Sequence, residues 1–108
     1  MGVEKNILRA GNGTNFPRVG DRVGIHYTGR LENGQEFDSS ISRGEPLFTR
    51  IGVGQVIKGW DEAIVTMSLG EKAILTISSD YGYGASGFPG LIPPHATLIF
   101  EVELVKIN

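Results

Sequence analysis

The stretch Arg22-Val-Gly-Ile-His-Tyr-Thr-Gly-Arg-Leu31 decides the fold class, because apolar side chains recur in it at every second residue. One side of the alternation carries Val23, Ile25 and Tyr27, and the other carries Gly24, His26 and Thr28. A period of two is typical of a half-buried β-strand. Glu32-Asn-Gly34 follows directly, and Asn-Gly favours a tight hairpin turn. We therefore expect a return strand at Gln35–Asp38.

Further strands and one helix follow from the same reasoning. Alternation predicts strands at Glu71–Ser78 and Thr97–Ile107, with shorter ones at Val3–Leu8 and Leu47–Ile51. Only Val56–Met67 has apolar residues at helical spacing; they are Ile57, Trp60, Ile64 and Met67, and Gly70 is expected to end the helix. The sequence thus predicts an α+β fold, an antiparallel sheet of about five strands with one short helix across it.

Composition limits the classes of function. The 108 residues predict a single domain spanning 1–108, and the absence of cysteine excludes a disulfide framework, a thiol nucleophile and a thiolate metal site. A net charge of −2 gives no electrostatic reason to bind nucleic acid or an anionic membrane. Neither a signal peptide nor a long apolar run is present, so we expect a cytoplasmic protein.

The segment Tyr81–Thr97 combines glycines and prolines with aromatic residues immediately before an apolar strand. Its apolar content argues against disorder, and we expect an ordered flap over a pocket. Gly82-Tyr-Gly-Ala-Ser-Gly87 matches the dinucleotide-binding pattern G-x-G-x-x-G. That motif needs a following helix, which Pro89, Pro93 and Pro94 forbid, so a dinucleotide cofactor is not expected.

No residue set suggests metal or nucleophilic chemistry. The two histidines, His26 and His95, lack metal-ligand spacing, and Asp38-Ser-Ser40 has no evident partner base. We therefore expect neither a metal nor a cofactor. What remains is a set of aromatic residues with few charges among them, which indicates either an ordinary core or an apolar ligand pocket.

Several motifs resemble the tacrolimus-binding (FKBP) family of immunophilins. They are His26-Tyr-Thr-Gly29, Glu36-Phe-Asp-Ser-Ser40, Val56-Ile-Lys-Gly-Trp60, Tyr81-Gly-Tyr-Gly84 and Ile92-Pro-Pro-His-Ala-Thr97. The resemblance runs from about Gly2 to Ile107 and keeps the motif order. It implies a sheet wrapped around one short helix and peptidyl-prolyl cis–trans isomerase activity. It also implies tacrolimus and rapamycin as ligands, with calcineurin or the TOR kinase as partners of the drug-bound form.

The resemblance also implies the site. Tyr27, Phe37, Asp38, Tyr83 and Phe100 would be catalytic, and Arg43, Leu47, Gln55, Val56, Ile57, Trp60, Phe88 and Ile92 would bind substrate or drug. Trp60 would be the floor under the prolyl ring, with the Ile57 N–H and the Tyr83 hydroxyl as donors to substrate carbonyls. Leu47 stands where the family commonly has an aromatic residue and Gln55 where it has an acidic one, and Phe88 occupies a variable position in the flap.

Two other interpretations use the same pocket. The chain could be a non-catalytic module that binds a proline segment of a partner protein and regulates it. Weak self-association is also conceivable, because a second copy could insert the exposed proline segment Phe88–Pro94 into the pocket, although we expect a monomer that binds proline-containing peptides and proteins.

Overall fold

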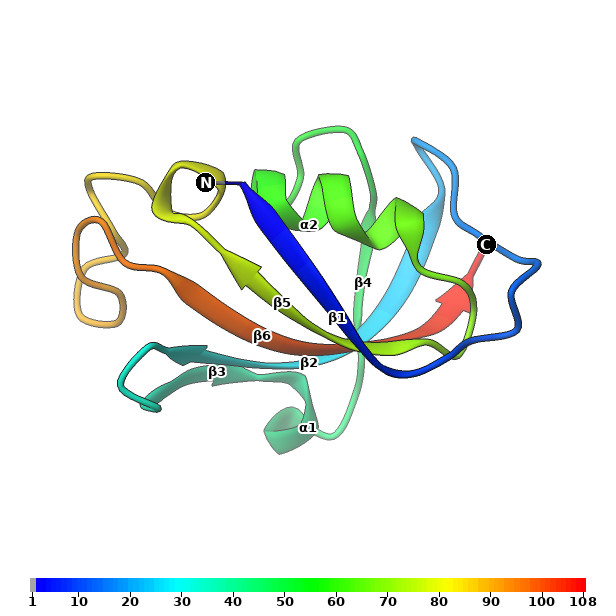
Figure 1. The fold of residues 1–108 in the computed structure, drawn as a ribbon, viewed down its shortest axis with the longest axis horizontal. Helices are drawn as coiled ribbons and strands as arrows, with labels where there is room; N and C mark the ends of the chain where they lie inside the picture. The colour runs from blue at the N-terminus through cyan, green and yellow to red at the C-terminus, as the bar shows by residue number, and fades with distance from the viewer. Residues whose placement is uncertain (1) are drawn as a thin grey trace.

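Six antiparallel strands form one sheet in the order β1-β5-β6-β2-β3 (Figure 1). β4 lies off this path and pairs with the first residues of β2, whereas β3 pairs with its later ones. The computed structural model describes residues 2–108. The strands are β1 Val3–Arg9, β2 Arg22–Leu31, β3 Glu36–Ser39, β4 Leu47–Arg50, β5 Lys72–Ile77 and β6 Leu98–Ile107. The helices are α1 Ser40–Arg43 and α2 Lys58–Ala63, with 3-10 turns η1 Ile64–Thr66 and η2 Ser79–Tyr81. The predicted α+β class is confirmed, with six strands where about five were expected.

The predicted hairpin joins β2 to β3. The Leu31 N–H donates to the Gln35 carbonyl, and the Gly34 N–H donates back to the Leu31 carbonyl, both at 2.9 Å. Gly34 has φ +91, a conformation that glycine adopts without steric cost. The chain then turns through α1, where the Ser39 hydroxyl accepts from the Ser42 N–H at 3.3 Å. The sequence reading did not anticipate α1.

Helix α2 is shorter than the predicted 56–67 segment. Its N-cap residue Ile57 has ψ 150, which is not helical, and Val56 lies in a bend before it, so the helix begins only at Lys58. Beyond Ala63 the chain tightens into η1, and Met67 is already extended. Gly70, expected to end the helix, lies instead in the turn before β5, with φ +89. Within residues 2–108, no helix is long and apolar enough to cross a membrane.

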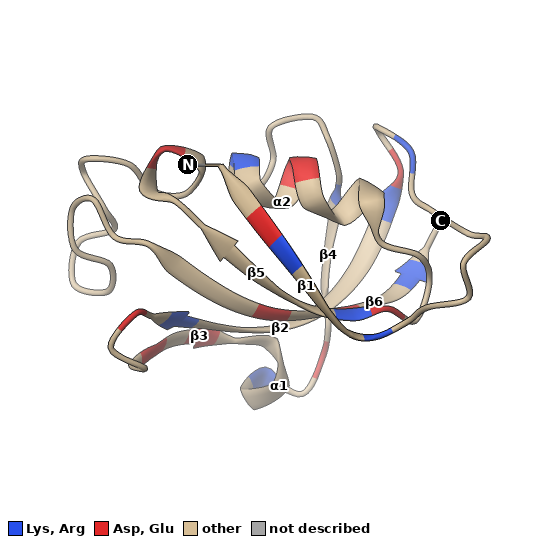
Figure 2. Cartoon of the chain, in the orientation of Figure 1, with Lys and Arg blue, Asp and Glu red and all other residues tan. Residues whose placement is uncertain are grey.

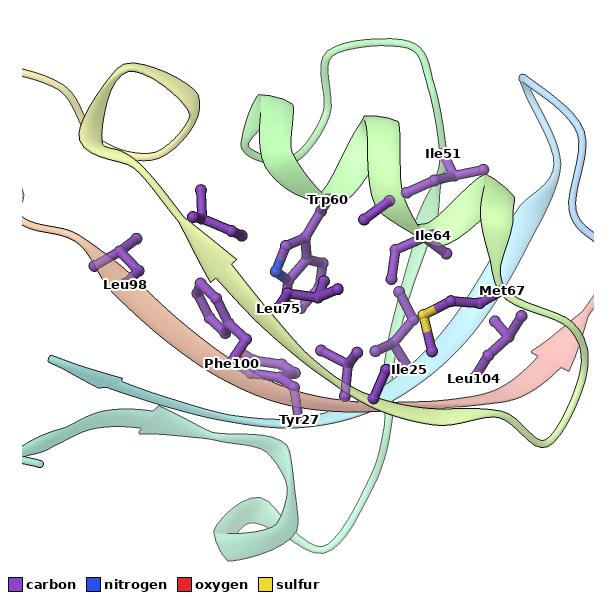
Figure 3. Close-up of a cluster of buried hydrophobic side chains, with 14 of the residues drawn as sticks. Ile25, Tyr27, Ile51, Trp60, Ile64, Met67, Leu75, Leu98, Phe100 and Leu104 are labelled. Carbon is purple, nitrogen blue, oxygen red and sulfur yellow. The ribbon is translucent and has the colours of Figure 1, made fainter. Parts of the chain in front are cut away.

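The core lies between α2 and the face of the sheet that it covers (Figure 3). The alternation in the strands puts Ile25, Leu75 and Val102 on this face, each at most 1% exposed. Helix α2 adds Trp60 and η1 adds Ile64, both buried. The alternation predicted for Arg22–Leu31 is confirmed, and the side with Val23, Ile25 and Tyr27 is the one that faces the core.

Close contact between α2 and β5 depends on Gly59. A Cβ atom at this position would lie 2.7 Å from Cγ2 and 2.8 Å from Cδ1 of Ile77, which is fully buried. The missing side chain therefore lets the helix approach the sheet and carries the neighbouring Trp60 into the core.

We expect Gly59→Ala to destabilise the protein. Alanine favours a helix over glycine by about 1 kcal/mol, but overpacking a core costs about 1–3 kcal/mol, so the steric term should dominate. Urea unfolding would measure the change in the free energy of unfolding. Glu62→Ala, on an exposed position of the same helix, should change it by less than about 0.5 kcal/mol. Stabilisation by Gly59→Ala would contradict the close approach.

Candidate active site

One cavity of about 160 Å³ opens beside the N-terminal end of α2. Its lining comes from β2, β3, β4, the segment before α2, α2 itself, the flap and β6. The lining residues are Tyr27, Phe37, Asp38, Leu47, Gln55, Val56, Ile57, Trp60, Tyr83 and Phe100. Pockets that enclose a drug-sized ligand typically measure about 300–1,000 Å³. This cavity is therefore suited to one ring, with the rest of a larger ligand lying over its rim.

Aromatic rings set edge-on form the floor and walls. The ring centroids of Tyr27 and Trp60 lie 5.0 Å apart at 80°, and those of Trp60 and Phe100 lie 5.2 Å apart at 77°. Phe37 meets Phe100 at 5.5 Å and 87°. Figure 3 shows Trp60 extending from α2 towards Phe100 and Tyr27 on the sheet. Edge-to-face contacts of this kind contribute about 0.5–1.5 kcal/mol beyond burial alone. The four rings of Tyr27, Phe37, Trp60 and Phe100 therefore form a rigid and apolar aromatic box.

Gly29 makes room for two of these rings. A Cβ atom on Gly29 would lie 2.7 Å from Cζ of Phe37 and 2.8 Å from Cε1 of Phe100. The glycine lies on the same side of β2 as Tyr27, two residues away. Its missing side chain is therefore part of the shape of the cavity, a role that the sequence reading did not assign.

A polar group stands at the edge of this apolar box. The Tyr27 hydroxyl donates to Oδ2 of Asp38 at 2.5 Å, and the Arg43 guanidinium donates to Oδ1 at 2.6 Å. Arg43 also donates to the Tyr27 hydroxyl oxygen at 2.9 Å, and the Ser39 N–H donates to Asp38 at 2.9 Å. Helix α1 positions Arg43, since it is the last residue of that helix. The three side chains form a closed network.

This network shifts the protonation equilibria. Burial alone would raise the pKa of Asp38, but hydrogen bonds from Tyr27 and Arg43, with the charge of Arg43, hold that pKa below its usual value. Burial, followed by the hydrogen bond to Asp38, raises the pKa of the Tyr27 phenol. Burial also raises the pKa of Tyr83, with a smaller contribution from the Asp38 charge. At neutral pH the site therefore holds an ionised carboxylate beside two neutral phenols.

Leu47 and Gln55, the two residues that differ from those common at their positions in the family, both line the cavity. Oε1 of Gln55 accepts from the Arg50 N–H at 3.2 Å and from the Thr49 hydroxyl at 3.3 Å. Both hydrogen bonds need only an oxygen acceptor at position 55. The amide oxygen of glutamine supplies it, as an oxygen of an acidic side chain would. Gln55 therefore keeps the acceptor that joins the segment before α2 to β4.

The flap contributes one ring to the lining. Tyr83 lines the cavity, and Phe88 packs edge-on against Tyr83 at 5.9 Å. Phe88 also bridges to Ile92 through two backbone hydrogen bonds of 2.8 Å, so the flap is ordered as predicted. His95 has φ +58, and its N–H donates to the Gly84 carbonyl at 3.0 Å, which ties the two ends of the flap together.

Three of the predicted site residues are not in the cavity lining. Arg43 reaches the site only through Asp38 and Tyr27, and Phe88 stands on the outer side of Tyr83 with 48% of its surface exposed. Ile92 is 5% exposed and belongs to the core. The structure brings all the other predicted residues together around the one cavity. Their individual roles stay predictions.

Comparison with known proteins identifies the family. The family model described as FKBP-type peptidyl-prolyl cis-trans isomerase matches residues 13–105. The chain belongs to this family. It is 63% identical, over its full length and 96% of the relative, to a peptidyl-prolyl cis-trans isomerase of Schizosaccharomyces pombe. It is 63% identical to FK506-binding protein 1 of Yarrowia lipolytica over the full length of both chains. FK506-binding protein 1 of Saccharomyces cerevisiae is 64% identical over 98% of this chain and 96% of its own.

Membership in the FKBP family confirms the predicted resemblance and the predicted enzyme class, a peptidyl-prolyl isomerase. Within residues 2–108, no group of histidine, aspartate and glutamate side chains could hold a metal ion.

We expect Arg43→Gln to raise the pKa of Asp38, because it removes the positive charge and both guanidinium hydrogen bonds. An NMR titration of the Asp38 carboxyl carbon would measure it. The folded-state pKa of Asp38 is depressed, so its contribution to stability is present above the unfolded pKa of about 3.9 and is lost as the pH falls through the folded value. The stability difference between wild type and variant should therefore shrink in acid.

The control for this titration is Arg30→Gln, because Arg30 lies on β2 and makes no ion pair within residues 2–108. It should leave the pKa of Asp38 unchanged. An equal shift in both variants would mean that general charge, and not the Arg43 contact, depresses this pKa.

Proposed function

We propose that this isomerase places the proline ring of its substrate on Trp60 inside the aromatic box. The observation that carries the proposal is the pairing of a single-ring apolar cavity with the Tyr27–Asp38 hydrogen bond at its edge. Tyr27, Phe37 and Phe100 surround the ring. The carbonyl that precedes the proline would then lie beside Tyr27, Phe37 and Asp38.

The chemistry needs desolvation more than it needs a reactive group. Rotation about an Xaa–Pro bond breaks amide resonance and has an uncatalysed barrier of about 18–20 kcal/mol. Reaching about 1–1,000 turnovers per second requires the removal of roughly 3–7 kcal/mol. The twisted amide loses conjugation and its carbonyl becomes less polar, so a pocket that excludes water favours the transition state over the planar ground state.

Two donors would orient the substrate. The Ile57 N–H and the Tyr83 hydroxyl have no hydrogen-bond acceptor within residues 2–108, and both residues line the cavity. They are therefore free to donate to substrate carbonyls on either side of the prolyl ring. Because this binding is the same in the ground and transition states, it would lower KM rather than raise kcat.

Asp38 has two possible parts in the reaction. Its carboxylate is held by Tyr27, Arg43 and Ser39, which favours a role in fixing the Tyr27 ring against Trp60. Its ionised oxygen also lies at the cavity edge, where it would influence the polarity of the rotating amide. We assign it both roles, with neither proton transfer nor covalent chemistry.

The same cavity would bind tacrolimus (FK506) and rapamycin. Relatives from two yeasts are named FK506-binding protein 1 and are 63–64% identical to this chain. A cavity for one ring, with the exposed side chains of Phe88 and Leu91 nearby in the flap, suits a ligand that inserts one group and lies over an apolar rim. Calcineurin or the TOR kinase would then be partners of the drug-bound protein.

Other expectations remain predictions. They are a role in protein folding, a cytoplasmic location, a single domain over residues 1–108, and a monomer that self-associates at most weakly through Phe88–Pro94. A light-scattering mass measured up to high protein concentration would test the last of these.

We expect Asp38→Ala and Tyr27→Phe each to reduce kcat/KM by about tenfold, or about 1.4 kcal/mol. Both changes weaken the polar edge and leave the apolar floor in place. The measurement is the cis-to-trans rate of a Leu-Pro model peptide. Glu36→Ala, on an exposed position of β3 outside the lining, should keep full activity. A loss of many orders of magnitude from either site variant would instead indicate acid–base or covalent catalysis.

We also expect excess rapamycin to abolish the isomerase activity of the wild-type protein on the same peptide. The drug and the proline would compete for the one cavity over Trp60. Activity that persists while the drug is bound, measured by calorimetry, would show that ligand and substrate use different sites.

A further inference from the structure

We propose that Asp61 is a positioning residue for catalysis, because its carboxylate holds the loop that leads into one wall of the cavity. Oδ1 accepts from the Gly52 N–H at 2.8 Å and Oδ2 accepts from the Gly54 N–H at 2.9 Å. Asp61 follows Trp60 directly in α2. One side chain next to the cavity floor thus fixes the loop that leads to the cavity wall.

Apart from Asp61, the loop is held at its two ends and by the side chain of Gln55, which accepts hydrogen bonds from Thr49 and Arg50. Ile51 is fully buried, and its backbone pairs with Asp21 and Gly20 at the start of the loop. At the other end, the Ile57 carbonyl accepts from the Trp60 and Asp61 N–H groups. Within residues 2–108, the backbone of residues 52–56 makes no hydrogen bond other than the two to Asp61.

The loop geometry requires such an anchor. Gly52 and Gly54 have φ +81 and +80, so the chain reverses tightly between Ile51 and Gln55. Glycine loses more conformational freedom on ordering than any other residue. Two hydrogen bonds to a carboxylate, which are stronger than neutral ones, offset that loss.

The wall that follows this loop contains one of the two proposed substrate donors, the Ile57 N–H. Gln55, Val56 and Ile57 come directly after Gly54 and line the cavity. Asp61 touches none of the space that a proline ring would occupy, since it is absent from the lining. It would therefore act through the position of the Ile57 N–H and the Val56 side chain, and this step rests on the proposed use of that wall by substrate.

The neighbouring residue provides a matched control. Glu62 is also acidic, is exposed, and makes no hydrogen bond or ion pair of its side chain within residues 2–108. Both residues belong to α2, on which Figure 2 shows acidic residues in red. Changing either carboxylate to an amide alters the net charge equally, so only the contact to the loop distinguishes them.

The experiment compares Asp61→Asn, Asp61→Ala and Glu62→Gln in the Leu-Pro peptide assay. An asparagine amide accepts from only one of the two glycine N–H groups, and alanine accepts from neither. We expect KM to rise in Asp61→Asn and to rise further, to about tenfold, in Asp61→Ala. The value of kcat should be nearly unchanged, because the wall binds ground and transition states alike. Glu62→Gln should match wild type.

A second readout separates positioning from stability. Amide hydrogen exchange should accelerate at Gly52 and Gly54 in the Asp61 variants, while the amides of β5 and β6 keep their protection. Uniform acceleration together with a fall in kcat would mean that Asp61 serves global stability, and unchanged KM in both variants would overturn the proposal. If the wild-type protein itself were inactive, the proposed function would be refuted. The comparison of variants with wild type tests only the role of Asp61, so the two failures can be told apart.

Discussion

The burial of Trp60 against the edges of Tyr27 and Phe100 is the constraint on which the rest of the site depends. The indole is 3% exposed, and its Nε1–H has no hydrogen-bond partner within residues 2–108. Its position is therefore fixed by ring packing and by the close approach of α2 at Gly59. A helix lying farther from the sheet would lift the floor of the cavity away from the walls.

The polar edge complements this apolar floor. Tyr27 contributes its ring to the box and its hydroxyl to the network with Asp38 and Arg43, so one residue belongs to both parts. Even partial burial of an ionised carboxylate is costly unless it is hydrogen-bonded. The donors from Tyr27, Arg43 and Ser39 supply those bonds, which is why a charge can stand beside an apolar pocket here.

The sequence predicted the long elements and most of the cavity, and it failed where geometry depends on short-range turns. Alternation over Arg22–Leu31 and Thr97–Ile107 is long enough to identify both strands and their buried faces. Helix α1 was missed because four residues carry no periodicity, although Ser39 and Gly44 are typical caps.

The individual site residues show the same limit. Phe88 and Ile92 are both apolar residues of the flap, and nothing in their order reveals that one is exposed and the other buried. Likewise, the predicted helix start at Val56 was wrong because apolar spacing continues through Ile57, whose backbone is extended. The anchoring of Gly52 and Gly54 by Asp61 is a contact across a loop, which no local pattern encodes.

The position of β6 in the sheet has a consequence for the synthesis of the chain. β6 is the last strand in sequence, yet it lies between β5 and β2 and pairs with both along most of its length. At roughly 5–20 residues per second, a ribosome would expose β2 several seconds before its main partner exists. The sheet cannot close, and Phe100 cannot complete the aromatic box, until β6 itself emerges. The facing edges of β2 and β5 therefore stay open to other chains until β6 has been made and pairs with both.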